Sequence, residues 1–110
     1  MNSTALVTGA ARGIGLSIAT LLARQGYQTV ATDIDGNVVE QEAARLRALG
    51  LDVRGFQLDI TDRAAVAALC TQLGAVDVLV NNAGMGARIL DDAGDVAAGL
   101  QTGRLTGWWH

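Results

Sequence analysis

A glycine-rich segment near the N-terminus contains the residue types that can bind a phosphate group. It follows a short apolar run, precedes a segment with helical periodicity, and reads Thr8-Gly9-Ala10-Ala11-Arg12-Gly13-Ile14-Gly15. Glycines permit a sharp turn and let backbone N–H groups approach a pyrophosphate, and the N-terminus of the following helix attracts the same anion. The spacing is G-x-x-x-G-x-G, unlike the common G-x-G-x-x-G fingerprint. We predict a phosphate-binding turn; the alternative is a tight turn without a ligand.

An acidic residue, Asp33, stands at the end of the next apolar run, roughly twenty residues after the glycines. A carboxylate there can accept hydrogen bonds from the hydroxyls of an adenosine ribose and would repel a 2′-phosphate, which favours NAD. Arg12 is a contrary signal, because its guanidinium could hold that phosphate. We therefore predict NAD over NADP. A solvated strand end is the alternative for Asp33, and Asp35 is the less favoured acid because it falls in the following loop.

Two later apolar runs are also followed by polar residues. Asp59 follows the third run, where it could accept a hydrogen bond from an adenine amino group or serve as a loop carboxylate before the next helix. The fourth run ends in Asn81-Asn82-Ala83-Gly84, whose amides and small residues suit a backbone that lies close to a ribose. Taken alone, this segment is equally compatible with a turn that binds nothing, and Asn81 could mainly connect neighbouring strands.

Strands alternating with helices would bring these residues together. The apolar runs cover residues 4–8, 28–33, 52–58 and 76–81, and the segments between them have helical periodicity. This alternation predicts an α/β fold of order β-α-β-α-β-α-β, a Rossmann-like, doubly wound parallel sheet truncated to about four strands. Ligands of such sheets bind beyond the carboxyl ends of the strands. In the first helix, helical spacing predicts one buried face made of Ile14, Ile18, Leu21 and Leu22.

Composition argues against several other classes of protein. The chain has 110 residues and a net charge of −3, and its basic residues form no cluster, so we expect no nucleic-acid partner. The single cysteine, Cys70, cannot form an internal disulfide or a metal cluster, which suits the cytoplasm. No run reaches the roughly 18 apolar residues of a membrane span, and the N-terminus has no signal-peptide pattern. We expect a cytoplasmic protein without a membrane partner.

Together, the Thr8–Gly15 turn, Asp33, Asp59 and the Asn81–Gly84 segment resemble the short-chain dehydrogenase/reductases, over about residues 4–90. The resemblance implies a sheet in which the third, second, first and fourth strands lie side by side, with NAD or NADP across their ends. It implies a pyrophosphate site lined by Gly9, Arg12, Gly13, Ile14 and Gly15. It implies that Asp33 meets the adenosine ribose and that the adenine meets Asp59 and Ile60. The region between the riboses would contact Asn82, Ala83 and Gly84.

The resemblance does not extend to the residues that transfer hydride in the family, a Tyr-x-x-x-Lys pair with a Ser and an Asn. This chain has no Lys; its only Tyr is Tyr27, and its only serines are Ser3 and Ser17. We therefore predict no catalytic residue here, and interpret the chain as the NAD(P)-binding portion of an oxidoreductase whose catalytic half is missing. A small-molecule substrate would be bound only by a full-length relative. The alternatives are a non-catalytic dinucleotide-binding module, an inactive truncated fragment or, against the glycine spacing, a methyltransferase.

The C-terminal residues 91–110 differ from the rest of the chain. Glycines interrupt any long helix, and Arg104 stands where the family pattern N-L-x-G has Asn. We predict a half-domain of residues 1–90 followed by an irregular tail, and hypothesise that the sequence from about Gly94 is a frameshifted or truncated end. The fourth strand would then present an apolar edge, for which we predict either self-association into a dimer that hides this edge or a marginally stable monomer.

Overall fold

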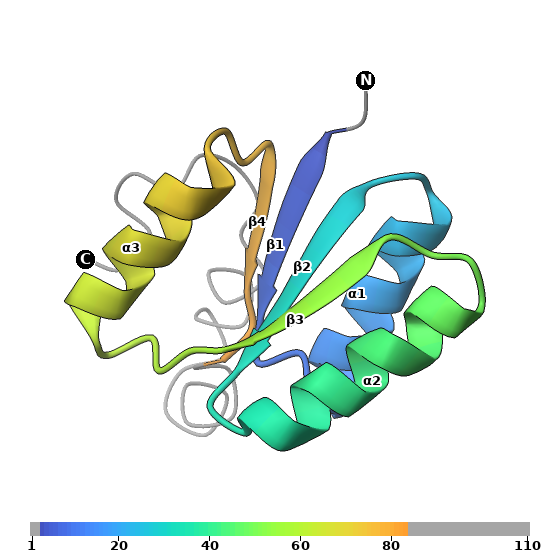
Figure 1. The fold of residues 1–110 in the computed structure, drawn as a ribbon, viewed down its shortest axis with the longest axis horizontal. Coiled ribbons are helices and arrows are strands. Elements are labelled where there is room, and N and C mark those ends of the chain that lie inside the picture. The colour runs from blue at the N-terminus through green and yellow to red at the C-terminus, as the bar shows by residue number, and fades with distance from the viewer. Residues whose placement is uncertain (1–2, 84–110) are drawn as a thin grey trace, which may run out of the picture.

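The computed structural model describes residues 3–83, and the predicted tail and Gly84 lie outside the described residues. Within that part strands and helices alternate along the chain, which confirms the predicted α/β fold (Figure 1). The elements are β1 (Thr4–Thr8), α1 (Gly13–Arg24), β2 (Gln28–Asp33), α2 (Gly36–Ala48), β3 (Val53–Gln57), α3 (Arg63–Leu73) and β4 (Val78–Asn81).

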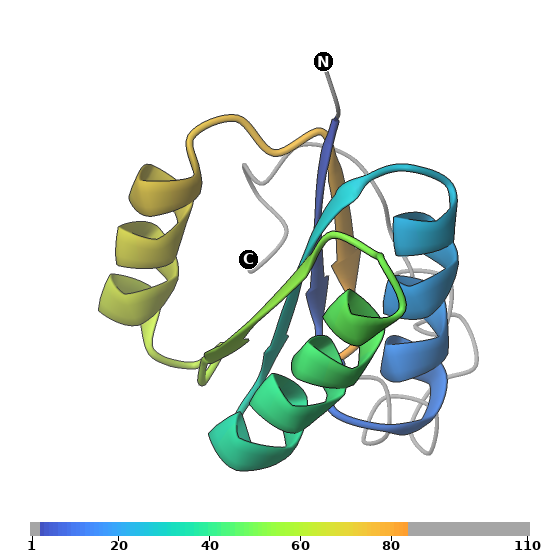
Figure 2. The same cartoon turned by 45° about the vertical axis from the view of Figure 1, so that its right-hand side comes forward.

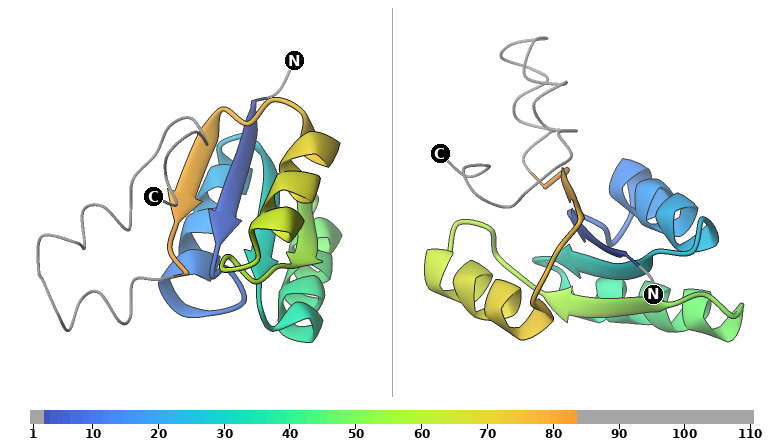
Figure 3. Two further views of the ribbon diagram at one scale, coloured as in Figure 1. Left: turned by 90° about the vertical axis from the view of Figure 1, so that its left-hand side faces the viewer. Right: turned by 90° about the horizontal axis from the view of Figure 1, so that it is seen from above.

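The described strands form one parallel sheet in the order β3-β2-β1-β4. Leu6 of the central strand β1 lies opposite Val30 of β2 on one side and Leu79 of β4 on the other. Helices α1 and α2 cover one face of the sheet and α3 covers the other (Figures 2 and 3). This division follows from the strand order, because right-handed crossovers outward from β1 and back to β4 pass over opposite faces.

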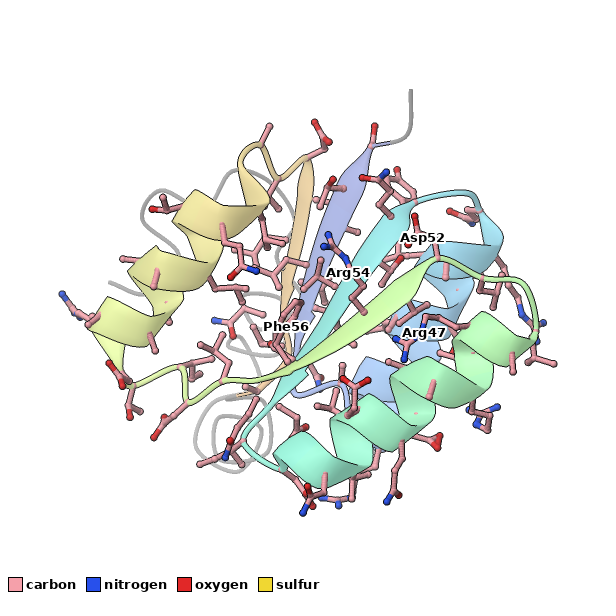
Figure 4. All side chains as sticks on the ribbon, viewed as in Figure 1. Arg47, Asp52, Arg54 and Phe56 are labelled. Atoms are coloured by element: carbon pink, nitrogen blue, oxygen red, sulfur yellow. The ribbon has the colours of Figure 1, made fainter. Side chains whose placement is uncertain are left out.

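Each face of the sheet has its own apolar core, because successive residues of a strand point to opposite sides. Val7 of β1 packs in the core beneath α1 and α2, whereas its neighbour Leu6 packs in the core beneath α3. On β3, Phe56 joins the α3 core, and Arg54 precedes it on the same face of the strand (Figure 4). Two covered faces explain why the strand sequences lack polar alternation.

The buried face of α1 differs from the prediction. Ile14 and Leu21 have exposed fractions of 57% and 56%, whereas the buried positions of the helix are Gly15, Ala19 and Ala23. Only small residues fit there because α1 lies close against the strands. Ile18 and Leu22 pack at the margin of the core, as partly buried residues.

Polar side chains fix the ends of α2 and α3. Asp35 Oδ1 accepts a hydrogen bond from the Val38 backbone N–H at 3.3 Å, and Asp62 caps α3 in the same way. At the other end of α2, Arg47 Nη1 donates to the Val53 carbonyl oxygen at 2.8 Å, which ties the helix to the start of β3 (Figure 4). These contacts hold the helices in place so that their N-termini lie near the carboxyl ends of the strands. Within residues 3–83, no helix is both long and apolar enough to cross a membrane.

Candidate functional site

The carboxyl ends of the parallel strands meet at one edge of the sheet, and most of the predicted site residues lie there (Figure 1). The glycine turn follows β1, Asp33 ends β2, Asp59 follows β3, and Asn82 follows β4. Since the four segments leave neighbouring strands at the same edge, the topology brings residues from distant parts of the sequence together.

The glycine turn combines close packing with an open side. Gly9 and Gly13 have φ values of 65° and 62°, in the left-handed region that favours glycine. A Cβ atom on Gly15 would collide with the carbonyl oxygen of Gly9, and one on Gly9 would lie 2.8 Å from the Ala83 Cα. At Gly13, by contrast, an added Cβ would meet nothing within 4 Å. The turn is therefore packed against the segment after β4 and open at the first residue of α1.

The N-terminus of α1 has no internal cap. Its N-cap residue, Arg12, makes no side-chain hydrogen bond to the helix backbone, and the first turn contains no acidic residue. Backbone N–H groups in the first turn lack intrahelical partners and carry the positive end of the helix dipole. Beside the open side of Gly13, these groups can bind an anion.

The Asp33 carboxylate is held against the glycine turn by backbone groups on either side. Its Oδ2 atom accepts a hydrogen bond from the Ala11 N–H at 3.0 Å, and its Oδ1 atom accepts one from the Asp35 N–H at 2.9 Å. A carboxylate oxygen can accept more than one hydrogen bond, so this orientation leaves capacity for the hydroxyls of a ligand. Asp33 is half-buried, and its reach toward Ala11 links the ends of β1 and β2.

Arg12 and Asp35 form an ion pair beside Asp33, which the sequence did not reveal. Arg12 Nη2 lies 2.8 Å from Asp35 Oδ2. The hydrogen bond from Arg12, with a smaller contribution from the Val38 N–H, lowers the pKa of Asp35 below its usual value. The carboxylate is therefore ionised at neutral pH, and the guanidinium in the turn already has an anionic partner.

The Asp59 side chain organises its own loop. Its Oδ1 atom accepts hydrogen bonds from the Thr61 hydroxyl at 2.7 Å and the Thr61 N–H at 2.9 Å, and these bonds lower the pKa of Asp59. Asp59 is exposed, and the side chain that caps α3 is that of Asp62. Ile60 packs against the core beneath α3.

Ile34 lines a pocket next to the predicted site, although no sequence motif singled it out. Its side chain has an exposed fraction of 65%, and it directly follows Asp33. An open pocket of about 480 Å³ lies between the start of α2 and the end of β3, lined by Ile34, Asp35, Gly36, Asn37, Glu40 and Gln57. The sequence did contain a sign of this role, because Ile34 is an apolar residue next to the predicted ribose-binding acid. An exposed isoleucine at this position can cover the face of a planar base.

The residues after β4 mainly tie the strand ends together. The Thr8 hydroxyl donates to Asn81 Oδ1 at 3.0 Å and accepts hydrogen bonds from the N–H groups of Asn82 and Ala83, at 3.0 and 3.1 Å. Asn82 Nδ2 donates to the Gly9 carbonyl oxygen at 3.0 Å. Asn81 thus connects β4 to β1, and the Asn82 amide holds the glycine turn.

The described residues outside this edge supply no second reactive site. Tyr27 directly precedes β2 and therefore lies at the opposite edge of the sheet from Asp33. Cys70 is half-buried, and burial raises the pKa of its thiol, which keeps it protonated and weakly nucleophilic at neutral pH. From Ser3 to Ala83, no three His, Cys, Asp or Glu side chains are grouped so as to hold a metal ion.

Comparison with known proteins decides the family. The family model described as short chain dehydrogenase matches residues 3–98. This chain belongs to the short-chain dehydrogenase family. The resemblance seen in the glycine turn, Asp33, Asp59 and the Asn81–Gly84 sequence is therefore confirmed, and so is the Rossmann-like sheet.

Individual dehydrogenases and reductases are also similar to this chain. The 1-deoxy-11-beta-hydroxypentalenate dehydrogenase of Streptomyces exfoliatus is 44% identical over 85 residues, 74% of this chain and 31% of that protein. A 3-oxoacyl-(acyl-carrier-protein) reductase of Staphylococcus aureus is 43% identical over 91 residues, 77% of this chain and 37% of that protein.

Solved structures of short-chain dehydrogenases have the same fold. A metagenomic short-chain oxidoreductase in complex with NADP has a TM-score of 0.69 and 36% identity, covering 74% of this chain and 38% of that one. The hydroxysteroid dehydrogenase from Escherichia coli also has a TM-score of 0.69 and 36% identity, covering 76% and 36%. This chain thus spans about a third of the length of the relatives that it matches.

Proposed function

We propose that this chain is the cofactor-binding portion of a short-chain dehydrogenase-type oxidoreductase and that it binds NAD in preference to NADP. The observation that carries the proposal is the Asp33 carboxylate, oriented by the N–H groups of Ala11 and Asp35 beside the open, uncapped N-terminus of α1. A dinucleotide needs an anion site and a ribose acceptor side by side, and both features fit it.

Each part of the dinucleotide has residues suited to hold it. The pyrophosphate would lie at the turn formed by Gly9, Arg12, Gly13, Ile14 and Gly15. The adenosine ribose would donate hydrogen bonds to Asp33, and the adenine would lie near Ile34, Asp59 and Ile60. Asn82 and Ala83 after β4, and with them Gly84, which lies outside the described residues, would border the ribose pair. Bound NAD supplies a hydride acceptor, and the role of this chain is to bind and orient it.

Among the residues that the structure describes, the chain contains none suited to move the accompanying proton. It has no Lys, so no Tyr-x-x-x-Lys pair exists in it, and Tyr27 stands at the amino edge of the sheet. A tyrosine with a pKa of about 10 needs a cationic neighbour to exchange its proton at neutral pH. We therefore propose that hydride transfer needs residues outside this chain. The chain alone would bind NAD without turning over alcohols or ketones. Its expected location is the cytoplasm.

The outer side of strand β4 suggests a second copy of the chain as a partner. Along β4 (Val78–Asn81), β1 pairs with one side, and in the part from residue 3 to residue 83 no strand pairs with the other. An unpaired strand edge is a template for pairing with another chain. We expect self-association that grows with concentration in size-exclusion chromatography. A monomer at every concentration would contradict this expectation.

Calorimetric titration with NAD and NADP tests the proposed function. We expect Asp33→Ala to weaken NAD binding by about 1–3 kcal/mol, the cost of leaving hydrogen-bond partners of a charged group unpaired. Asp52→Ala is the matched control, because Asp52 is an exposed acid just before β3, at the amino edge of the sheet (Figure 4). Folded protein that binds neither dinucleotide at millimolar concentration would refute the proposal, and unchanged affinity in Asp33→Ala would remove Asp33 from the site.

A further inference from the structure

The acid two residues after Asp33 is fixed in place by three contacts. The Asp35 N–H donates to Asp33 Oδ1 at 2.9 Å, and Asp35 Oδ1 caps α2 through the Val38 N–H at 3.3 Å. Its second carboxylate oxygen, Oδ2, lies 2.8 Å from Arg12 Nη2. Backbone contacts thus position Asp35, and the longer Arg12 side chain reaches across to it from the glycine turn.

We propose that Asp35 is a specificity-determining residue, which engages Arg12 in an ion pair and so withholds a cation that could bind the 2′-phosphate of NADP. The inference rests on the proposed function, because it assumes that a dinucleotide binds at this edge with its adenosine ribose at Asp33. It goes further because it assigns a role in cofactor preference to Asp35, which belongs neither to the glycine turn nor to the ribose acceptor.

The charges around Asp33 explain why the pair would favour NAD. A 2′-phosphate would replace the ribose hydroxyl that Asp33 accepts, and it would bring negative charge beside two carboxylates. Arg12 could bind this phosphate with paired N–H donors. It would first have to leave Asp35, whose carboxylate would then face the phosphate without its partner. NAD carries a hydroxyl at this position, so its binding neither separates Arg12 from Asp35 nor brings a phosphate next to the carboxylates.

The exposure of the pair sets the size of the effect. The Arg12 and Asp35 side chains have exposed fractions of 66% and 38%, so water and salt screen their attraction. Exposed ion pairs are weak, so we expect breaking this one to change the ratio of the two dissociation constants by no more than about two- to fivefold. Asp35 therefore tunes the preference that Asp33 establishes.

The test is the ratio of the dissociation constants for NADP and NAD, measured by calorimetry on the whole chain. Asp35→Asn removes the charge and keeps a side chain that caps helices well. We expect NADP affinity to rise about two- to fivefold while NAD affinity stays unchanged. Asp35→Ser, a second neutral cap, should give the same result, and the far-ultraviolet circular dichroism of both variants checks that they fold.

Two further variants separate the ion pair from a general effect of charge. Asp62→Asn removes the charge of the corresponding N-cap acid on α3 and should leave the ratio unchanged. In the Arg12→Gln background, Asp35→Asn should give a smaller gain in NADP affinity, because it then only removes a carboxylate near the phosphate and frees no arginine. An equal gain in that background, or no gain with Arg12 present, would overturn the role of Asp35. Binding of neither dinucleotide to the unaltered chain would overturn the proposed function and this inference together.

Discussion

The Asn82 side-chain amide donates a hydrogen bond to the Gly9 carbonyl oxygen at 3.0 Å. This contact joins the segment after β4 to the glycine turn after β1. It fixes the outer wall of the turn from a strand that is distant in the sequence. The amide that the sequence assigned to the ribose region therefore has a structural role within the protein itself.

Asn82→Asp should destabilise the protein and weaken dinucleotide binding together. A carboxylate cannot donate to the Gly9 oxygen and would repel it, so we expect the free energy of unfolding to fall by about 1–2 kcal/mol. Urea unfolding and calorimetric titration with NAD measure the two effects. Gln41→Glu is the control, since it adds the same charge at an exposed position of α2 outside the pocket lining. Full stability with weakened NAD binding would show that Asn82 acts on the ligand directly.

Loss of the Thr8 hydroxyl should destabilise the protein more than loss of the Thr8 methyl group. It is fully buried, and its oxygen accepts the N–H groups of Asn82 and Ala83. Thr8→Val leaves both donors without this acceptor, so we expect a loss of about 2–3 kcal/mol in the free energy of unfolding. Thr8→Ser keeps the hydroxyl and should lose only about 1 kcal/mol from the missing methyl group. Equal urea midpoints for the two variants would contradict this account.

The glycines of the turn should respond differently to alanine. At Gly15 the new methyl group would meet the Gly9 carbonyl, and we expect a loss of about 3 kcal/mol, the upper end of the overpacking range. At Gly13 it meets open space, so only the positive φ costs stability, about 1–2 kcal/mol. Thermal unfolding compares the two costs. Gly13→Ala should also reduce NAD affinity, because its methyl group occupies the side open to a phosphate.

Local sequence patterns were sufficient to predict the fold. Strand and helix alternation follows from apolar runs and helical periodicity, and these also place Asp33 and the glycine turn at strand ends. The buried face of α1 was mispredicted because periodicity gives most weight to large apolar residues. The close approach of α1 to the sheet instead selects Gly15, Ala19 and Ala23.

The side-chain partners within the site could not be predicted in the same way. Arg12 and Asp35 are 23 positions apart in sequence, and their contact depends on how the glycine turn and the start of α2 converge. Asn82 likewise reaches Gly9 across 73 positions. No spacing rule links such residues, because tertiary packing decides which polar groups meet.

The pKa of Asp35 reports directly on its pairing with Arg12. The Arg12 hydrogen bond lowers that pKa from the usual 3.8, with a further contribution from the Val38 N–H. A carboxyl group with a lowered pKa stabilises the folded state above its unfolded value, and this stabilisation is lost as the pH falls from about 3.8 through the lower folded value. Arg12→Gln should therefore raise the pKa of Asp35 part of the way back, because the Val38 contact remains. It should also reduce the loss of stability in that pH range.

Carbon-13 NMR titration of the aspartate carboxyl groups measures this change residue by residue. Asp59 provides an internal control, because Thr61 lowers its pKa through contacts that do not involve Arg12. We expect the Asp35 titration to move toward higher pH in Arg12→Gln while that of Asp59 stays in place. If Asp35 titrates identically with and without the arginine, the ion pair does not persist in solution. In that case the pairing of Arg12 with Asp35 could not explain a preference for NAD over NADP.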